Sequence, residues 1–232
     1  MTYGAAMPSD RERASRARQI LDDAGAVIAG DHFVYDTGRH GDGWIAKDLI
    51  FPHTELADEL GSMLADACAD LGGEIVCGPA TGGLIVSQWT AHHLGLPSVF
   101  ADHAKEQGYD PASAGSGPLR APFVLKRGYD EAVRGKRVLL VDDVVNTGLA
   151  LRETAAAVGV AGGELVAAGV LSTRGFADAG ACGAPVLISL CEVVVPSWPA
   201  AECELCRRGV PVNTRYAHGA DFLAQQAALH DA

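Results

Sequence analysis

The stretch that decides the fold is Val138-Leu139-Leu140-Val141-Asp142-Asp143-Val144-Val145-Asn146-Thr147-Gly148-Leu149-Ala150. Its first four residues are apolar and follow a polar segment, a pattern typical of a short strand that is buried on both faces. From Leu151 the chain is rich in Ala, Arg and Glu, a composition that favours a helix. The stretch therefore predicts a strand, an acidic pair, a small-residue loop and a helix.

The loop of this unit is a candidate anion site. Asn146, Thr147 and Gly148 stand where the helix begins, and free backbone N–H groups and the helix dipole favour a phosphate there. Asp142 and Asp143 come at the carboxyl end of the strand, where open α/β sheets build their sites. For an isolated acidic pair, a solvated turn that caps the next helix is an equally good interpretation.

Four hydrophobic residues, two acids and a Thr-Gly loop together resemble the phosphoribosyl-pyrophosphate (PRPP) motif of type I phosphoribosyltransferases. The segment is not a Walker A loop, because no Gly-Lys-Ser/Thr follows. The resemblance implies an α/β fold with a mostly parallel central sheet, flanking helices and a small hood subdomain. It also implies that Asp142 and Asp143 are catalytic residues that hold the ribose hydroxyls. The 5′-phosphate would lie in the loop made of Asn146, Thr147, Gly148, Leu149 and Ala150.

A second unit of strand, loop and helix precedes this one. Glu74 to Cys77 predicts a strand, Gly78 to Gly83 a glycine-rich loop, and Leu84 to His93 a helix. A lone glycine loop is more often a structural turn between a strand and a helix. In the resembled family, however, the corresponding loop holds the pyrophosphate, and its candidate residues here are Thr81, Gly82 and Gly83.

Residues 30–48 predict a hairpin that follows an amphipathic helix over residues 11–29. Phe33-Val34-Tyr35 and Trp44-Ile45-Ala46 have the composition of strands, with glycine-rich sequence between them. An ordinary edge hairpin explains this composition. The order Phe-x-x-x-x-Gly-Arg-His, then an aromatic residue and Lys-Asp, is nevertheless similar to the hood of orotate phosphoribosyltransferases, which closes over the base. The resemblance implies four base-binding residues, Gly38, Arg39, His40 and Lys47.

The segment from Asp102 to Pro122 is too long and too polar for a simple connection. In the resembled family a mobile loop at this place closes over PRPP. This implies a catalytic role for Lys105 within the loop and PRPP binding by Lys126 and Arg127 on its return. A solvated surface position is about as good an interpretation of each of these basic residues. The loop lacks the Arg-Lys pair and the His-Gly of the best-known orotate enzymes, so the residue that does the work of the loop lysine stays open.

Arg174 follows a strand predicted over Gly163–Leu171. In orotate enzymes an arginine at this strand end binds the orotate carboxylate, and a guanidinium suits a planar carboxylate. The Asp that usually precedes this arginine is Thr173 here. An arginine at a strand end is structural about as often as it is functional.

The whole chain limits the function further. Its 232 residues suit one α/β domain with a modest accessory part, and its net charge of −11 argues against binding to nucleic acid or anionic membranes. With no apolar run of membrane-spanning length and no signal-peptide pattern, we expect a cytoplasmic protein with reduced cysteines. Cys203 and Cys206 could begin a zinc site that Cys191 or His218 completes, although structural thiols are the favoured interpretation.

These patterns and the resemblance imply a disordered start at 1–10, a helix and hood hairpin at 11–50, a PRPP-binding core at 51–195 and a tail that completes the hood at 196–232. The implied activity is transfer of the phosphoribosyl group of PRPP to orotate. Mg²⁺ would be held mainly through PRPP and water, without direct side-chain ligation. A homodimer is a family expectation. Transfer to a different base and a non-catalytic PRPP-binding regulator stay open as alternatives.

Overall fold

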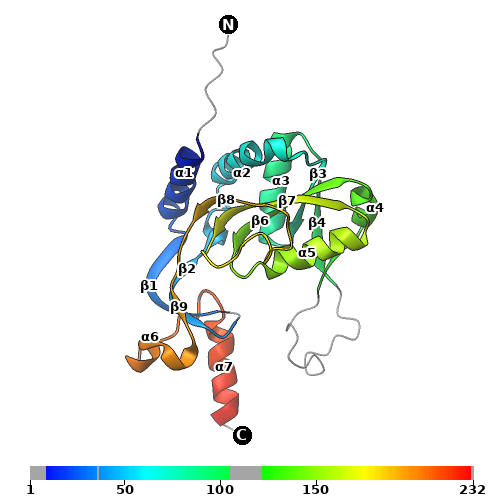
Figure 1. The fold of residues 1–232 in the computed structure, drawn as a ribbon. Helices are drawn as coiled ribbons and strands as arrows, with labels where there is room; N and C mark the ends of the chain where they lie inside the picture. Colours follow the sequence, from blue (N-terminus) through cyan, green and yellow to red (C-terminus); the bar gives the residue numbers. More distant parts are fainter. Residues whose placement is uncertain (1–8, 36, 105–121, 231–232) are drawn as a thin grey trace.

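The computed structural model describes residues 9–35, 37–104 and 122–230, which form two sheets and the helices around them (Figure 1). The larger sheet has the strand order β5-β4-β3-β6-β7-β8. All neighbouring strands are parallel except β4 and β5. The expected mostly parallel sheet is therefore confirmed. Its strands are β3 (Ile75–Pro79), β4 (Ser98–His103), β5 (Phe123–Leu125), β6 (Arg137–Val145), β7 (Glu164–Thr173) and β8 (Leu187–Glu192).

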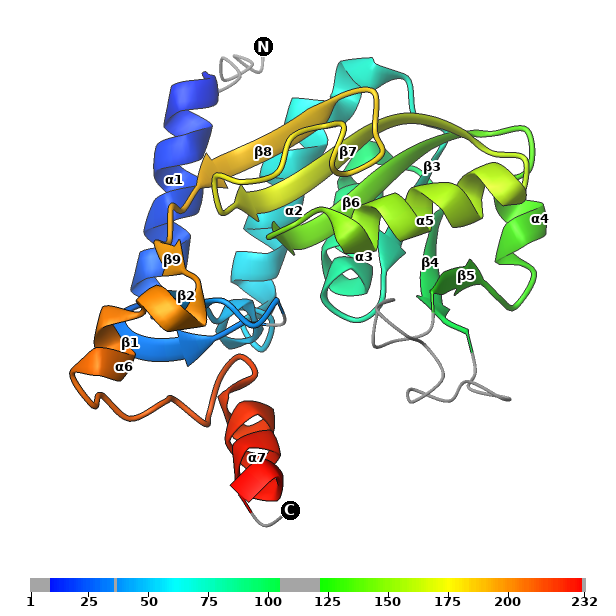
Figure 2. The same cartoon turned by 60° about the horizontal axis from the view of Figure 1, so that its bottom comes forward.

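The central strand β6 shows why helices cover both faces of this sheet. Successive side chains of a strand point to opposite faces. Leu139 and Val141 accordingly belong to one buried hydrophobic cluster, whereas Val138 and Leu140 belong to another. Figure 2 shows α5 on one side of the sheet and α2 and α3 on the other. These helices, together with the N-terminal one, are α1 (Asp10–Asp23), α2 (Thr54–Cys68), α3 (Gly82–Leu94) and α5 (Leu149–Val160).

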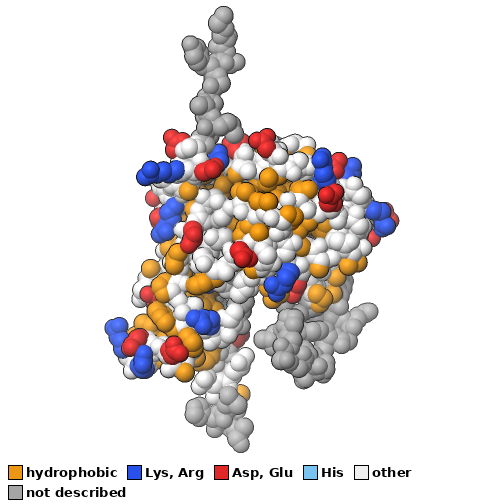
Figure 3. All heavy atoms as spheres, viewed as in Figure 1, with side chains coloured by type: hydrophobic (Ala, Val, Ile, Leu, Met, Phe, Trp, Pro, Cys, Tyr) orange, Lys and Arg blue, Asp and Glu red, His pale blue; other side chains and the backbone are white. Residues whose placement is uncertain are grey.

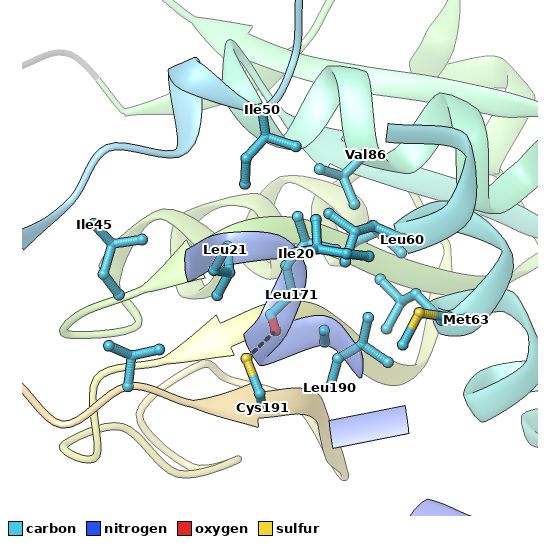
Figure 4. Packing of buried hydrophobic residues seen from close by; sticks show 14 of the residues in the cluster. Ile20, Leu21, Ile45, Ile50, Leu60, Met63, Val86, Leu171, Leu190 and Cys191 are labelled. Carbon is cyan, nitrogen blue, oxygen red and sulfur yellow. Dashed lines mark hydrogen bonds between the residues drawn. The ribbon is translucent and has the colours of Figure 1, made fainter. Parts of the chain in front are cut away.

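The first of these clusters also fixes α1 to the edge of the sheet (Figure 4). Ile20 and Leu21 are each about 1% exposed and belong to the same cluster as Leu190 and Cys191 of β8. The thiol of Cys191 donates a hydrogen bond to the carbonyl oxygen of Leu171 at 3.5 Å. Cys191 is therefore a core residue of the sheet and lies outside any cluster with Cys203 and Cys206.

The smaller sheet, which we call the hood, is antiparallel and lies beside one end of the larger sheet (Figure 1). Its order is β1-β2-β9, with β1 at Val27–Val34, β2 at His40–Ile45 and β9 at Ser197–Trp198. The turn is shorter than the predicted glycine-rich segment because Gly41 and Gly43 belong to β2 and pair with residues of β1. A Cβ on Gly41 would lie 2.2 Å from the hydroxyl oxygen of Tyr35, so the close packing of this strand requires glycine.

Some boundaries differ from the predicted ones. α1 ends at Asp23, since Gly25 has a φ of +65°, and residues 27–29 of the predicted helix are strand instead. β6 continues beyond Val141 to Val145 because its last residues pair with β7. The C-terminal tail contains the helix α7, which runs over Gly219–His230.

Two short helices complete the described chain, α4 at Tyr129–Val133 and α6 at Glu204–Arg207. At the N-terminus, Ser9 and Glu12 form a capping box for α1. None of the helices in the described ranges has both the length and the apolar character needed to cross a bilayer.

Candidate functional site

The acidic pair lies at the end of β6 and is almost completely buried. Asp142 is 8% exposed and Asp143 2% exposed. The backbone N–H of Asp143 donates to Oδ1 of Asp142 at 2.8 Å, and that of Val144 donates to Oδ1 of Asp143. The two carboxylates are therefore held in fixed orientations by their own strand.

The loop after the pair forms a cavity of about 110 Å³ whose lining runs from Asp142 through residues 144–151. Gly148 precedes the first turn of α5 with a φ of +79°, and a Cβ there would lie 2.7 Å from the carbonyl oxygen of Ala181. No side chain caps the N-terminus of α5. Its first N–H groups therefore have no side-chain cap, and residues at this helix start line the cavity, an arrangement suited to an anion.

The second glycine loop packs directly onto the acidic pair. A Cβ on Gly82 would lie 1.6 Å from Oδ2 of Asp143, and one on Gly83 would lie 2.7 Å from Oδ1 of Asp142. Only glycine lets the start of α3 approach the carboxylates this closely. Thr81 precedes this helix without a side-chain cap, and the peptide bond between Ala80 and Thr81 is cis. The structure thus brings together the two loops that the sequence predicts between a strand and a helix, because β3 and β6 are neighbours in the sheet.

Lys47 reaches the same place from the hood. Its Nζ lies 2.7 Å from Oδ2 of Asp143, and its side chain is 31% exposed. Burial raises the pKa of the Asp143 carboxyl above its ordinary value, against the lowering effect of the Lys47 ammonium. Burial alone would lower the pKa of Lys47, but the charge and hydrogen bond of Asp143 outweigh it and raise that pKa. A cation is therefore fixed beside the acidic pair.

Arg174 lies at the end of β7 in a pocket between the hood and the large sheet. It is 3% exposed, and its Cζ lies 4.2 Å from the centre of the Tyr35 ring. Its Nε and Nη2 are buried and have no hydrogen-bond partner among the described residues. A buried guanidinium with two unpaired donors is costly unless a ligand accepts those hydrogen bonds.

Two adjoining cavities of about 220 and 150 Å³ share Arg174, Tyr35 and Asn146 in their linings. The larger also includes Thr147 and Arg39, and the smaller includes Lys47 and Trp44. Since Asn146 and Thr147 also line the cavity at the start of α5, the anion loop and the aromatic pocket are continuous. Sequence reasoning missed Tyr35 as a pocket residue. The position of Tyr35 three residues before Gly38-Arg39-His40 could have indicated that it lies near the base pocket.

Several predicted site residues occupy other positions. His40 is 1% exposed, and its Nδ1 faces His32 and Cys206 within the hood, so its side chain does not line the pocket. Gly38 lies in the hairpin turn with a φ of +73° and is not among the residues that line either cavity. Arg39 donates to the hydroxyl and carbonyl oxygens of Ser197, at 3.1 and 2.7 Å.

Two basic residues at the return of the predicted mobile loop lie away from the three cavities and pair with an acidic residue instead. Lys126 and Arg127 both form ion pairs with Asp102, at 3.3 and 3.6 Å. Neither residue lines the three cavities described above. Lys105 lies outside the described residues.

Comparison with known proteins agrees with this geometry. Residues 49–188 match the phosphoribosyl transferase domain family, and these residues span both glycine loops and the acidic pair. The chain belongs to the phosphoribosyltransferase family. The orotate phosphoribosyltransferases of Brucella ovis and Brucella suis are 37% identical to this phosphoribosyltransferase over 186 residues, which is 78% of this chain and 85% of theirs.

Solved structures share the fold. Orotate phosphoribosyltransferase from Aeropyrum pernix aligns with a TM-score of 0.59 at 22% identity, over 75% of this chain and 92% of that one. Adenine phosphoribosyltransferase from Thermoanaerobacter pseudethanolicus aligns with a TM-score of 0.57 at 19% identity, over 75% and 99%. Since enzymes with two different bases share this fold, the choice of base has to be argued from the site.

Proposed function

We propose that this phosphoribosyltransferase transfers the phosphoribosyl group of PRPP to orotate, giving orotidine 5′-monophosphate and pyrophosphate. The observation that carries the proposal is Arg174, whose buried guanidinium presents two unpaired donors to an aromatic-lined cavity continuous with the phosphate loop. A planar base with a carboxylate satisfies such donors, whereas adenine has no anionic group to offer them. The 37% identity to orotate phosphoribosyltransferases supports the same substrate.

In this proposal the described residues would hold PRPP by position and charge. The 5′-phosphate would accept hydrogen bonds from the N-terminus of α5, and the diphosphate would lie at the N-terminus of α3. Asp142, at the edge of the phosphate cavity, would orient the ribose hydroxyls. A ring nitrogen of orotate loses its proton to solvent and forms the new bond to C1 of the ribose while the bond from C1 to the diphosphate oxygen breaks. Catalysis then depends on positioning and on stabilising the departing anion.

The oxygen atoms available at this site are of the kind that binds Mg²⁺. The carboxylates of Asp142 and Asp143 and the oxygens of a bound diphosphate would give the hard oxygen environment that Mg²⁺ prefers. Lys47 already neutralises Asp143, so the carboxylate that would approach the ion, through water or ribose oxygens, is Asp142. When bound, the ion would supply positive charge to the leaving diphosphate. Activity should therefore be lost with a chelator and restored by added Mg²⁺.

The proposal includes a cytoplasmic homodimer. Figure 3 shows hydrophobic side chains gathered in the middle of the face that carries β7 and β8, with charged groups mainly around the rim. On either side of β8, Val186 is 41% exposed and Val194 65% exposed. Exposed apolar side chains gathered on one face in this way are typical of an interface. Sedimentation of the purified protein would test the dimer.

The experiment that tests the substrate compares Arg174→Met and Arg174→Lys with the wild type. Hydrogen bonds to charged groups are worth about 1.5–3 kcal/mol, so we expect KM for orotate to rise roughly tenfold to a hundredfold in Arg174→Met. KM for PRPP should stay nearly constant, and Arg174→Lys should recover only part of the loss because it lacks the planar fork. Arg134→Met, at an exposed arginine that lines none of the three cavities, is the matched control.

A panel of bases completes the test. The proposal predicts turnover of orotate and none of adenine or hypoxanthine. Turnover of a purine in place of orotate, or an unchanged KM for orotate in Arg174→Met, would contradict it. PRPP that raises the melting temperature without turnover of any base would point to a PRPP-binding regulator.

A further inference from the structure

The hood contains a cluster of four potential metal ligands that the transfer reaction does not use. It consists of His32 of β1, His40 of β2, and Cys203 and Cys206 at the start of α6 and within it. One ligand atom from each lies within 4.8 Å of all the others. Three of the four residues are buried, and Cys206 is the exposed one. The cluster therefore lies near the surface of the hood, with its two histidines on the β1–β2 hairpin.

Four of the six distances between ligand atoms in the cluster match one tetrahedral ion. A zinc ion with Zn–S of about 2.3 Å and Zn–N of about 2.0–2.1 Å places nitrogen and sulfur ligands about 3.5 Å apart and two nitrogens about 3.3 Å apart. Nε2 of His32 lies 3.6 Å from the sulfur of Cys203 and 3.7 Å from that of Cys206. Nδ1 of His40 lies 3.3 Å from the sulfur of Cys206 and 3.0 Å from Nε2 of His32. Each of these separations is within a few tenths of an ångström of the tetrahedral value.

His32 is also oriented as a ligand. Its Nδ1 lies 2.8 Å from the carbonyl oxygen of Val210, so the N–H at Nδ1 donates there and leaves the lone pair of Nε2 directed at the two sulfurs. Val210 follows α6 in the same tail segment as the cysteines. Two further backbone hydrogen bonds join tail and hairpin, from Asn213 to His32 and from His218 to Val34. The tail is thus folded back along β1, as Figure 2 shows for α6 beside this strand.

We propose that His32, His40, Cys203 and Cys206 form a structural zinc site that fastens the C-terminal tail to the hood. Two thiolates and two imidazoles are the ligands of structural zinc sites, and four protein ligands leave no open position for chemistry. A two-iron cluster fits less well, because it assigns the two cysteines to one iron and the two histidines to the other. The mixed nitrogen–sulfur separations here are those of ligands on one ion.

The site would stabilise the part of the hood that closes the base pocket. Arg39, which lines the larger cavity, directly precedes His40 and bonds to Ser197 of β9. With zinc bound, β1, β2 and the tail are joined at one point, so the turn that carries Arg39 is held between the ion and β9. None of the four ligands lines a cavity of the transfer site. The proposal therefore does not depend on which base the enzyme uses.

The first test measures metal in the wild-type protein as purified, without chelators and without an immobilised-metal column. We expect about one zinc ion per chain by plasma mass spectrometry. Cys203→Ser and Cys206→Ser should each lose most of it. Cys68→Ala is the matched control, because Cys68 is buried in α2 against the sheet and should keep its zinc content unchanged.

Cobalt provides a readout that does not require a stable variant. After chelation and addition of Co²⁺, the wild type should show the intense visible bands of tetrahedral cobalt and the ultraviolet bands of cobalt–thiolate bonds. Added zinc should bleach these bands. Chelation alone should expose two further thiols to a thiol reagent and lower the melting temperature.

Other results would overturn the proposal. A wild-type protein with only trace metal that also binds no Co²⁺ would identify the cluster as hydrogen-bonded thiols and imidazoles. Zinc content unchanged in both cysteine variants would place the ion elsewhere. A protein purified with Cys203 and Cys206 joined as a disulfide, and with no zinc after reduction in the presence of the metal, would make the pair a redox site instead.

Discussion

The ion pair between Lys47 and Asp143 gives the sharpest prediction of stability. In Lys47→Met the side chain keeps much of its volume but loses the ammonium that lies 2.7 Å from the carboxylate. Removal of one partner from a buried pair costs about 3–5 kcal/mol, because the other charge is left buried. With the Lys47 side chain 31% exposed, we expect the lower end of that range, about 3 kcal/mol.

The cost should depend on pH with a definite sign. Loss of the Lys47 ammonium removes the group that lowers the pKa of the Asp143 carboxyl, so that pKa rises further above its ordinary value. A carboxyl whose folded pKa is raised above the unfolded value takes up a proton on folding, so the folded state of the variant gains relative to its unfolded state as pH falls. The difference between wild type and Lys47→Met should therefore shrink from neutral pH towards the ordinary carboxyl value of 3.8.

Urea denaturation followed by circular dichroism, at neutral and at mildly acidic pH, measures this difference. Lys136→Met at an exposed lysine is the matched control and should change stability by less than about 0.5 kcal/mol. The double variant Lys47→Met/Asp143→Asn should recover much of the loss, since the buried charge is then removed. A single variant as stable as the control, or a double variant whose losses simply add, would refute a coupled ion pair.

The remaining predictions concern the glycine loop, the buried thiols and the core. Gly82→Ala should abolish transfer by displacing the carboxylate that its Cβ would meet at 1.6 Å, whereas Gly159→Ala, with open space around it in α5, should keep activity and gain about 0.5–1 kcal/mol in urea denaturation. Equal activity in the two variants would contradict the close packing. Burial raises the pKa of Cys68 and Cys77 to about 12, so neither should react with a thiol reagent in native protein at pH values well below that, and rapid labelling of either in peptide mass spectra would contradict their burial. Leu140→Ala should lower the free energy of unfolding by about 2–5 kcal/mol because the residue is fully buried, and a loss below about 1 kcal/mol would contradict that position.

The parts of the site predicted from sequence are those formed by consecutive residues. The apolar run, the acidic pair and the loop before α5 are consecutive in the chain. The sequence alone therefore predicts that a strand ends and a helix begins there. Arg174 was placed correctly at the end of β7 for the same reason. Its unpaired nitrogens and its contact with Tyr35 were not predictable, because the aromatic ring comes from the hood, far away in sequence.

The rest of the site depends on contacts between distant segments. The sequence assigned Lys47 and His40 alike to the base, yet Lys47 pairs with Asp143 while His40 faces Cys206. His40 begins β2, whereas Lys47 lies beyond the end of that strand, and the register of the hairpin cannot be read from its glycine-rich composition. Cys203 and Cys206 marked half of a ligand set, but the histidines that complete it lie in the first two strands of the chain.

The most direct test of the account is the loss of orotate absorbance in a mixture of the purified enzyme, PRPP and Mg²⁺, run beside Arg174→Met. The account predicts turnover by the wild type that requires both PRPP and Mg²⁺, and a variant that approaches the wild-type rate only at much higher orotate. An inactive wild type that nevertheless turns over another base with PRPP would contradict the assignment of orotate, while the fold and the PRPP site would stand.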